Sequence, residues 1–276
     1  MKRIIALLSF IVLTFTSCTS NDETSQNHDT SILPKTIIYS EGANSDTTTL
    51  SYNGNKIQEI THASGYKSIY TYTDDLITNV TSYKGPTIDN THDYTYENGK
   101  LTSDLNVNYS QNTTQTYKLK SVFTHNNDGT ILEERYNVDS KTGAETKNGN
   151  SEMYTFTNGN LTKQISTSTS TYFDGIKSTT TTYTYTYIFE YDDKNNPSIN
   201  ILGLNKIEFF DNASKNNINK IIITERTTNG VVTSSEPTVI YYTTSYNDTN
   251  FLTESNHTDS DGNNNTIEYK QKYFYD

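Results

Sequence analysis

The chain has one cysteine, four prolines and no tryptophan, and only 32% of its 276 residues are hydrophobic. A single cysteine excludes a disulfide framework within the chain. Even with the 13 glycines added, the apolar fraction stays below the about 45–50% of typical globular chains. A thick aliphatic core, of the kind that a Rossmann fold or a TIM barrel requires, is therefore not expected.

Aromatic residues, by contrast, are plentiful, with 23 tyrosines and 10 phenylalanines. Disordered chains have few aromatics and a high net charge, so this content predicts a folded chain. The sequence is also rich in threonine, asparagine, serine and isoleucine, and these residue types favour exposed β-sheet and turns. The composition thus predicts β-structure without assigning an activity.

The first residues follow the pattern of an export signal. Lys2 and Arg3 precede an apolar run, Ile4–Leu13, which is too short to span a bilayer as a helix. Small residues then lead into Cys18. The segment resembles a bacterial lipoprotein signal, and the resemblance implies cleavage before Cys18 and acylation of that residue with fatty acids such as palmitate. An ordinary secretory signal with an unrelated cysteine is the alternative interpretation.

Two features after the cysteine bear on location. Thr19 stands where some bacteria place the aspartate that retains lipoproteins at the inner membrane, and Asn21–Glu23 loosely resembles the acidic export signal of Bacteroidota surface lipoproteins. We therefore expect a lipid-anchored outer-membrane protein, surface-facing rather than periplasmic. The predicted parts are a signal peptide, a lipidated flexible tether and a single antiparallel β domain, at residues 1–17, 18–35 and 36–276.

Positive charge is scarce. The 21 lysines and arginines stand against 32 acidic residues, a formal net charge of −11, and removal of Lys2 and Arg3 changes it to −13. Neutralising nucleic-acid phosphates requires patches of lysine and arginine, so no nucleic-acid partner is expected. The expected partner is the membrane, through the N-terminal lipid, together with an envelope protein or a glycan.

From Thr36 onward the chain repeats one hairpin unit. A strand with alternating aromatics meets a turn of Asn, Asp and Gly, and a second strand follows with Leu or Ile. Asn-Gly and Asp-Gly suit two-residue hairpin turns, because both turn positions need φ > 0. The copies, spaced as expected for two strands and two turns, are Leu50–Ile57, Tyr70–Ile77, Tyr94–Leu101, Phe123–Ile131 and Tyr154–Leu161.

The segment Thr182–Tyr191 shows how the two faces of a strand divide. Its odd-numbered residues are all tyrosine or phenylalanine, and its even-numbered residues are threonine, isoleucine and glutamate. A period of two predicts a strand, and an aromatic face opposite a polar face is typical of an antiparallel sheet with one side in water. Neither face suits the lipid-facing band of a transmembrane barrel. The sequence predicts an all-β, water-soluble fold in which antiparallel hairpins form a curved sheet or a barrel-like meander.

Two resemblances add to this prediction. The Tyr-x-Tyr-x-(Asn/Asp)-Gly-x-Leu units are loosely similar to the YD-type repeats of RHS proteins, which build shells of β-hairpins. Phe189–Pro197, Ile201–Gly203, Ser214–Ile218 and the closing Tyr273–Tyr275 resemble a family of uncharacterised Bacteroidota lipoproteins. That resemblance implies a porin-like β fold from about Leu50 to the C-terminus, and it implies no activity and no site residues.

Sequence motifs for catalysis are missing. No Gly-x-Ser-x-Gly elbow, His-Glu-x-x-His, Walker loop or Gly-x-Gly-x-x-Gly occurs, and the five histidines are scattered. Glu133 and Glu134 are adjacent on an expected strand and point to opposite faces. A carboxylate-pair hydrolase, the third interpretation, would therefore need a partner from another strand. We expect no enzyme activity and no cofactor.

Two acidic turns are weak candidates for calcium binding. Asp192 and Asp193 open a cluster of oxygen-bearing side chains, and Asp259 and Asp261 belong to an Asp-Ser-Asp-Gly segment. Carboxylate oxygens are calcium ligands, but the same side chains satisfy backbone donors in turns. Turns are the favoured interpretation, and no metal site is assigned.

The tyrosine-rich strand surface is the last candidate. Tyr183, Tyr185 and Tyr187 offer contact area and a hydroxyl at little entropic cost, which suits a glycan or a peptide. Alternatively, tyrosine replaces leucine in a thin core. The sequence predicts a lipid-anchored outer-membrane β-protein that acts as a non-catalytic binding or scaffold module. The alternative is a carrier that holds a hydrophobic or glycan ligand in the concave face of the sheet.

Overall fold

A computed structural model describes residues 32–109, 116–209, 214–229, 231–260 and 266–275. Within these ranges the chain forms eighteen β-strands and one turn of 3-10 helix, η1 (Leu204–Lys206). No helix in the described part of the chain is long and apolar enough to cross a membrane. The predicted all-β fold is confirmed, whereas Cys18 and Asp261 lie outside the described residues.

Few residues separate one strand from the next, except where the connection that contains η1 follows β12. In chain order they are β1 (Pro34–Glu41), β2 (Asn44–Asn53), β3 (Lys56–His62), β4 (Tyr66–Thr73), β5 (Leu76–Lys84), β6 (Thr87–Glu97), β7 (Lys100–Tyr109), β8 (Thr116–His125), β9 (Ile131–Val138), β10 (Glu145–Thr157), β11 (Asn160–Phe173), β12 (Ser178–Tyr191), β13 (Ile218–Thr228), β14 (Val232–Ser234), β15 (Thr238–Tyr241), β16 (Thr243–Tyr246), β17 (Leu252–Ser260) and β18 (Thr266–Tyr275).

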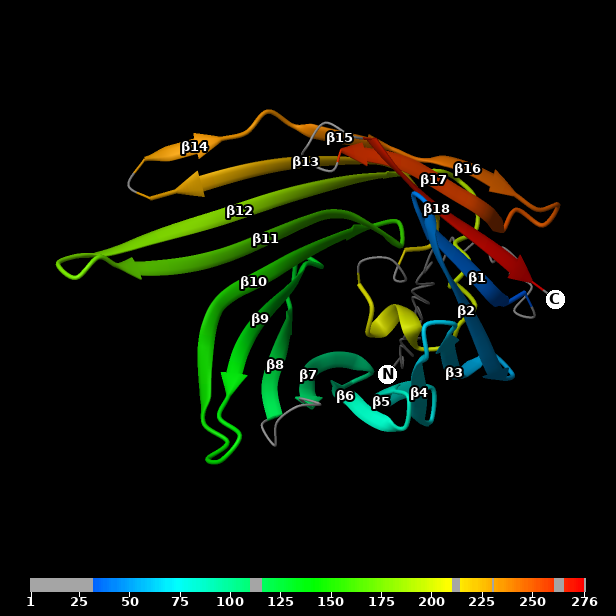
Figure 1. Ribbon diagram of the computed structural model, residues 1–276, viewed down its shortest axis with the longest axis horizontal. Helices are drawn as coiled ribbons and strands as arrows, with labels where there is room; N and C mark the ends of the chain where they lie inside the picture. Colours follow the sequence, from blue (N-terminus) through cyan, green and yellow to red (C-terminus); the bar gives the residue numbers. More distant parts are fainter. Residues whose placement is uncertain (1–31, 110–115, 210–213, 230, 261–265, 276) are drawn as a thin grey trace, which may run out of the picture.

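The strands form a single antiparallel meander. Each strand from β1 to β13 pairs with the next, β13 also pairs with β15, and β16 pairs with β17 and β17 with β18. The sheet curves so far that β18 returns to pair with β1, with Ile37 opposite Tyr273. It is not closed into a complete cylinder. Figure 1 shows the strands around a concave interior, with β11 to β14 reaching beyond the body.

The curvature has a repeated local cause. In the unit around Tyr96, Asn98 (φ 51°) and Gly99 (φ 73°) form the turn that the sequence predicts. The register then shifts between Thr95 and Tyr96, so that Thr102 is an extra residue on β7. Such bulges bend a strand and increase its twist. The same shift recurs beside Tyr52, Tyr72 and Phe156.

The second residue after each of these turns fills the core. Ile57, Ile77, Leu101 and Leu161 are at most 2% exposed and lie on the concave side of the sheet. They belong to or lie beside two apolar clusters, one around Ile57, Ile77 and Leu204 and one around Leu161, Phe189 and Ile221. The prediction of a thin core is therefore correct.

Tyrosines of the same units complete this core, and their hydroxyls bond to buried backbone. The hydroxyl of Tyr96 donates to the carbonyl of Ile77 at 2.6 Å, and that of Tyr191 donates to the carbonyl of Leu161 at 2.6 Å. Burial raises the pKa of Tyr96, and it raises the pKa of Tyr72, another member of the set, to about 12. Tyrosine thus replaces an aliphatic residue and also donates a hydrogen bond to the carbonyl of a buried residue.

The connection between β12 and β13 crosses the concave face. Ile201 and Leu204 enter the first apolar cluster, and Phe209 packs against the second, 5.5 Å from Phe123 and 5.3 Å from Tyr154 between ring centroids. In Figure 1 this segment lies inside the curve of the sheet. A loop of this length in a compact domain is uncommon, and here its described residues bury apolar side chains between two parts of one sheet.

The predicted division of faces in β12 holds near the body of the protein. Phe189 is 3% exposed, whereas its neighbour Ile188 is 43% exposed. Tyr187 packs against the second apolar cluster. Further along, the hairpin of β11 and β12 leaves the body, and both its faces meet solvent. Tyr172 and Phe173 near its tip are 70% and 62% exposed.

Candidate functional site

A band of polar side chains runs around the concave face. Residues directly opposite in an antiparallel ladder lie on one face, and His92 pairs with buried Val80 on one side and with Asn106 on the other. Following the pairing from strand to strand identifies the other polar residues on the same face. The polar belt, as we call it, consists of Asp46, His62, Ser68, Ser82, Asn90, His92, Asp104, Asn106, Ser121, Glu133, Arg135, Glu152 and Ser166.

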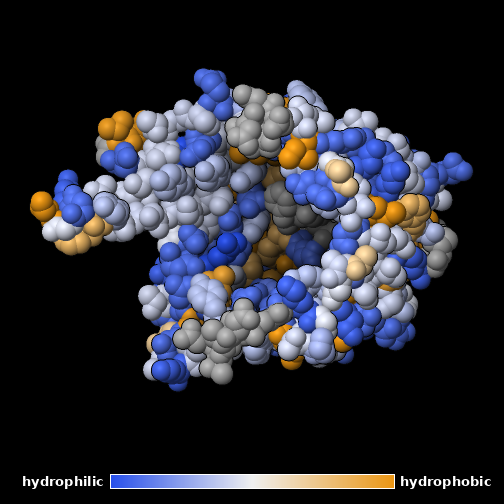
Figure 2. All heavy atoms as spheres, in the orientation of Figure 1, coloured by the Kyte–Doolittle hydropathy of each residue, from blue (hydrophilic) through white to orange (hydrophobic). Residues whose placement is uncertain are grey.

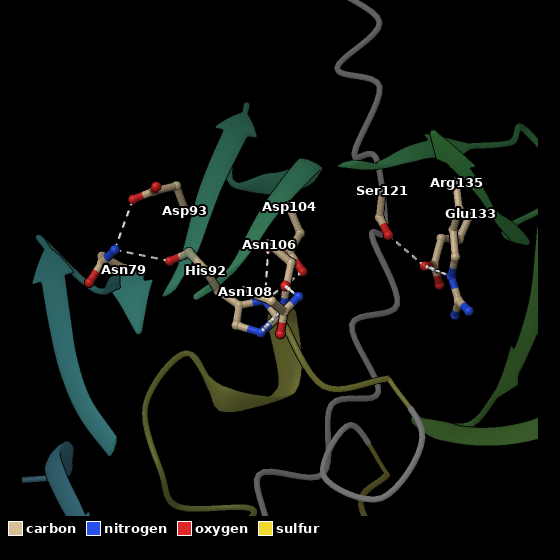
Figure 3. Close-up of polar contacts among 9 residues, drawn as sticks. All are labelled: Asn79, His92, Asp93, Asp104, Asn106, Asn108, Ser121, Glu133 and Arg135. Carbon is tan, nitrogen blue, oxygen red and sulfur yellow. Dashed lines mark hydrogen bonds and ion pairs between the residues drawn. The ribbon is translucent and has the colours of Figure 1, made fainter. Parts of the chain in front are cut away.

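The first part of the belt centres on His92, on β6. Its Nδ1 lies 2.9 Å from an Asp104 oxygen, and the Asn106 amide nitrogen lies 2.5 Å from its Nε2 (Figure 3). Each ring nitrogen is therefore engaged, one by a carboxylate and the other by an amide. Asp104 could orient the ring as a general base, but the Asn106 amide occupies the nitrogen that would take the proton.

The second part of the belt centres on Glu133, on β9. Its carboxylate accepts hydrogen bonds from Ser121 (2.7 Å) and Arg135 (2.8 Å) (Figure 3). It also accepts one from the Tyr154 hydroxyl (2.8 Å). Glu152, directly opposite on β10, lies 3.8 Å from the Arg135 guanidinium. Burial and the nearby Glu133 charge raise the pKa of Tyr154.

This arrangement bears on the carboxylate-pair interpretation. Glu133 and Glu134 point to opposite faces, as predicted: Glu133 is 6% exposed, and Glu134 pairs with Lys147. The carboxylate directly opposite Glu133 is Glu152, which sequence alone could not place because it belongs to another strand. Arg135 lies between the two carboxylates and pairs with both. The geometry is that of an internal ion pair in which one guanidinium is shared by two carboxylates.

Two cavities open on the concave side. One, of about 290 Å³, is bordered by Asp104, Glu133 and Glu208 together with Phe123 and Phe209. The other, of about 420 Å³, lies between β1, β13, β17, β18 and the connection after β12. Figure 2 shows the molecule hollowed at its centre, with hydrophilic side chains around the opening. The larger cavity falls within the size range of small-molecule sites, about 300–1,000 Å³.

Aromatic rings line one wall of the larger cavity. His257 on β17 lies between Tyr269 on β18 and Tyr242, with ring centroids 4.9 Å and 4.6 Å away. The rings of His257 and Tyr269 are parallel within 11°. Burial lowers the pKa of His257, and the Asp259 charge opposes that shift in part. We call Tyr242, His257 and Tyr269 the aromatic strip.

Apolar and polar groups share the other walls of this cavity. Ile37, Ile221 and Leu252 supply apolar surface, while Ser255 and Gln271 border it with polar side chains. Gln271 also accepts a hydrogen bond from the Tyr273 hydroxyl at 2.8 Å. This combination of apolar surface and a few polar groups is typical of ligand pockets.

The tyrosines singled out by the sequence lie elsewhere. Tyr187 stacks on Phe189, with centroids 6.4 Å apart, and belongs to the second apolar cluster. Tyr183 and Tyr185 lie further along β12, half-buried, where Tyr185 interacts with Glu225. None of the three borders either of the two cavities.

The acidic candidates lie in turns and at a strand end. Asp192 accepts from the backbone N–H groups of Lys194 (2.9 Å) and Asn217 (3.1 Å) and from the Tyr246 hydroxyl, which ties the connection to β13 and β16. Asp193 is exposed and pairs with Lys194, while Asp259 lies near the end of β17. The described residues contain no group of three histidine, cysteine or acidic side chains that could hold a metal ion.

Sequence reasoning missed the aromatic strip. The alternation in Thr266–Tyr275 assigns Tyr269 to one face of a strand, but it does not show which strands flank it. Only the pairing of β17 with β18 brings His257 opposite Tyr269.

Comparison with known proteins reveals a likeness in fold. No protein-family model matches the chain, and no curated protein matches it either. The crystal structure of a porin-like protein from Bacteroides vulgatus aligns with a TM-score of 0.55 at 11% sequence identity, over 89% of this chain and 99% of the other. The fold is porin-like. A second porin-like protein, from Bacteroides uniformis, aligns over 88% of this chain and 98% of its own at 10% identity and a TM-score of 0.49.

The match to the Bacteroides vulgatus protein confirms the porin-like β fold that the resemblance implied. At such low identity the likeness concerns the fold alone. The similarity of the hairpin units to YD-type repeats stays a prediction.

Proposed function

We propose that the protein is a non-catalytic binding module of the cell envelope that receives a ligand in the larger cavity of its concave face. Lipid attached to Cys18 anchors it to the outer membrane with the β domain towards the cell surface. The observation that carries the binding role is the cavity of about 420 Å³, whose walls come from four strands and the long connection.

The cavity favours a ligand carrier over a plain scaffold. A scaffold needs only a filled concave face, whereas this face leaves a cavity with stacked aromatic rings and polar borders. The walls are too mixed for a purely hydrophobic cargo, since Ser255, Gln271 and Asn217 lie among the apolar residues. Hydrolysis is the weaker alternative because Glu133 and Glu152 are engaged by Arg135.

The envelope location rests on the N-terminal sequence. Porin-like proteins of Bacteroides share the fold, and the segment up to Cys18 resembles a lipoprotein signal. Labelled fatty acid should enter the protein, and Cys18→Ala should abolish labelling and release the chain from the membrane fraction, while Thr19→Ala should change neither. Labelling that survives Cys18→Ala would end the anchoring proposal.

The binding role is tested by blocking the cavity. Compounds from the envelope, including sugars, lipids, peptides and cations, are screened for those that raise the melting temperature of the chain, because a ligand that binds only the folded state stabilises it. Ser255→Trp places a large ring in the cavity, and Asn256→Trp places it on the opposite face of β17. Stabilisation by at least one compound should be lost in Ser255→Trp and kept in Asn256→Trp. The proposal fails if no compound stabilises the protein, or if both variants respond like the wild type.

A further inference from the structure

The aromatic strip forms one wall of the larger cavity. Tyr242, His257 and Tyr269 come from separate segments, and the pairing of β17 with β16 and with β18 holds them in contact. Aromatic rings are apolar over most of their surface and carry their polar atoms at the edge. A ligand that lies against this wall needs one weakly polar side.

The larger cavity carries little charge. None of the described side chains that border it is a carboxylate, and burial keeps His257 neutral at pH 7 by lowering its pKa. Lys270 contributes to the border, but its ammonium lies 3.6 Å from Glu254 and 3.7 Å from Glu268. The smaller cavity differs, because Asp104, Glu133 and Glu208 border it. Burying an ionic ligand in the larger cavity would therefore leave its charge without a partner.

Polar groups around the strip can meet hydroxyl groups of a ligand. Gln271 and Ser255 are opposite each other on β18 and β17 and border the same cavity. Tyr39 lies opposite Gln271 on β1 and adds a phenol. Amide and hydroxyl side chains both donate and accept hydrogen bonds, which matches a ligand whose polar groups do both.

We infer that the larger cavity binds an uncharged saccharide, with a sugar ring against the aromatic strip and its hydroxyls on Gln271 and Ser255. A pyranose combines one face of C–H groups with equatorial hydroxyls at its edge, and so it matches both walls. This inference rests on the proposed binding role and adds the chemical class of the ligand.

Isothermal titration calorimetry on the full-length chain in detergent tests whether the larger cavity binds an uncharged saccharide. The probes are cellohexaose, maltohexaose, xylohexaose and mannohexaose, with tetragalacturonate and palmitate as charged and apolar comparisons. At least one uncharged hexasaccharide should bind, and tetragalacturonate should bind more weakly. Tyr242→Ala and Tyr269→Ala should each raise the Kd of the bound hexasaccharide about fivefold to tenfold, as expected for the loss of an aromatic contact.

A matched control lies next to the strip. Tyr241 precedes Tyr242 but is 68% exposed on the other face, with Lys220 over its ring. Tyr241→Ala should leave the Kd unchanged. Gln271→Ala, which removes a polar group and no ring, should weaken binding in a chain whose thermal unfolding is unaltered. This variant keeps the test decisive if the ring variants lose stability.

The results separate the two proposals. If a sugar binds with the same Kd after substitution of Tyr242, Tyr269 or Gln271, the assignment of the site is overturned. Binding of palmitate alone, or tighter binding of tetragalacturonate than of every uncharged probe, overturns the saccharide class and leaves the binding role standing. If no probe binds, the inference is refuted, and the blocking experiment with Ser255→Trp decides the binding role on its own.

Discussion

A closed ring of hydrogen bonds joins the long connection to the sheet, and it should unfold as a unit. The N–H of Leu161 donates to the Ser214 hydroxyl at 3.1 Å, and that hydroxyl donates to the Tyr191 hydroxyl at 3.0 Å. Tyr191 donates in turn to the carbonyl of Leu161 at 2.6 Å. Ser214 and Leu161 are at most 1% exposed, so water cannot replace a missing partner without a structural change.

The cost of breaking this ring follows from the groups left behind. Ser214→Ala leaves the buried N–H of Leu161 unpaired. Tyr191→Phe removes one hydrogen-bond partner of the Leu161 carbonyl. An unsatisfied buried group costs about 1–3 kcal/mol, so we expect each variant to lose about 2 kcal/mol of unfolding free energy. The double variant should lose about 3 kcal/mol, because either change alone already disrupts the bond between the two hydroxyls.

Urea unfolding of the three variants and the wild type measures this coupling. Tyr172→Phe is the matched control, since Tyr172 is 70% exposed and loss of its hydroxyl should cost under about 0.5 kcal/mol. Losses that add without coupling would show that the two hydroxyls act independently. Losses no larger than that of Tyr172→Phe would show that the ring contributes nothing.

Three further changes test other parts of the structure. Gly203→Ala should destabilise the protein in thermal unfolding, because Gly203 has φ 78° and an added Cβ would lie 3.0 Å from a backbone oxygen; unchanged stability would contradict the described path of the connection. Burial lowers the pKa of His257, so the unfolded chain binds the proton more readily, and unfolding free energy should fall as pH drops below about 6.5. His257→Phe should flatten that dependence, and an identical pH profile would count against a buried neutral ring. Tyr187→Ala should cost about 2–3 kcal/mol in urea unfolding and Thr186→Ala under about 1 kcal/mol, whereas equal losses would mean that both faces of β12 are covered.

The repeat units show how much local sequence can predict. Asn98-Gly99 specified a tight hairpin, and the structure has both residues at positive φ. The alternation in Thr182–Tyr191 predicted one covered face, and Phe189 and Ile188 bear this out. These features depend on backbone preferences within a few residues. The bulge beside Tyr96 was not predicted, because it depends on the pairing of two strands.

The candidate site was less predictable for the same reason. Tyr183, Tyr185 and Tyr187 form the clearest tyrosine pattern in the sequence, yet they do not border the cavities. Their strand borders the second apolar cluster at one end and leaves the body at the other. Periodicity identifies a face but not what lies opposite it.

The sequence by itself determined the strands, the turns, the alternation of faces and the scarcity of positive charge, since each depends on residue type and short-range spacing. The tertiary structure decided which inward faces became core, polar belt or cavity. Glu133 meets Glu152 across a ladder, and His257 meets Tyr269 across another. The return of β18 to β1 and the passage of the connection across the concave face then enclose the larger cavity. Such contacts join residues far apart in the chain, and they arise only when the curved sheet brings its two ends together.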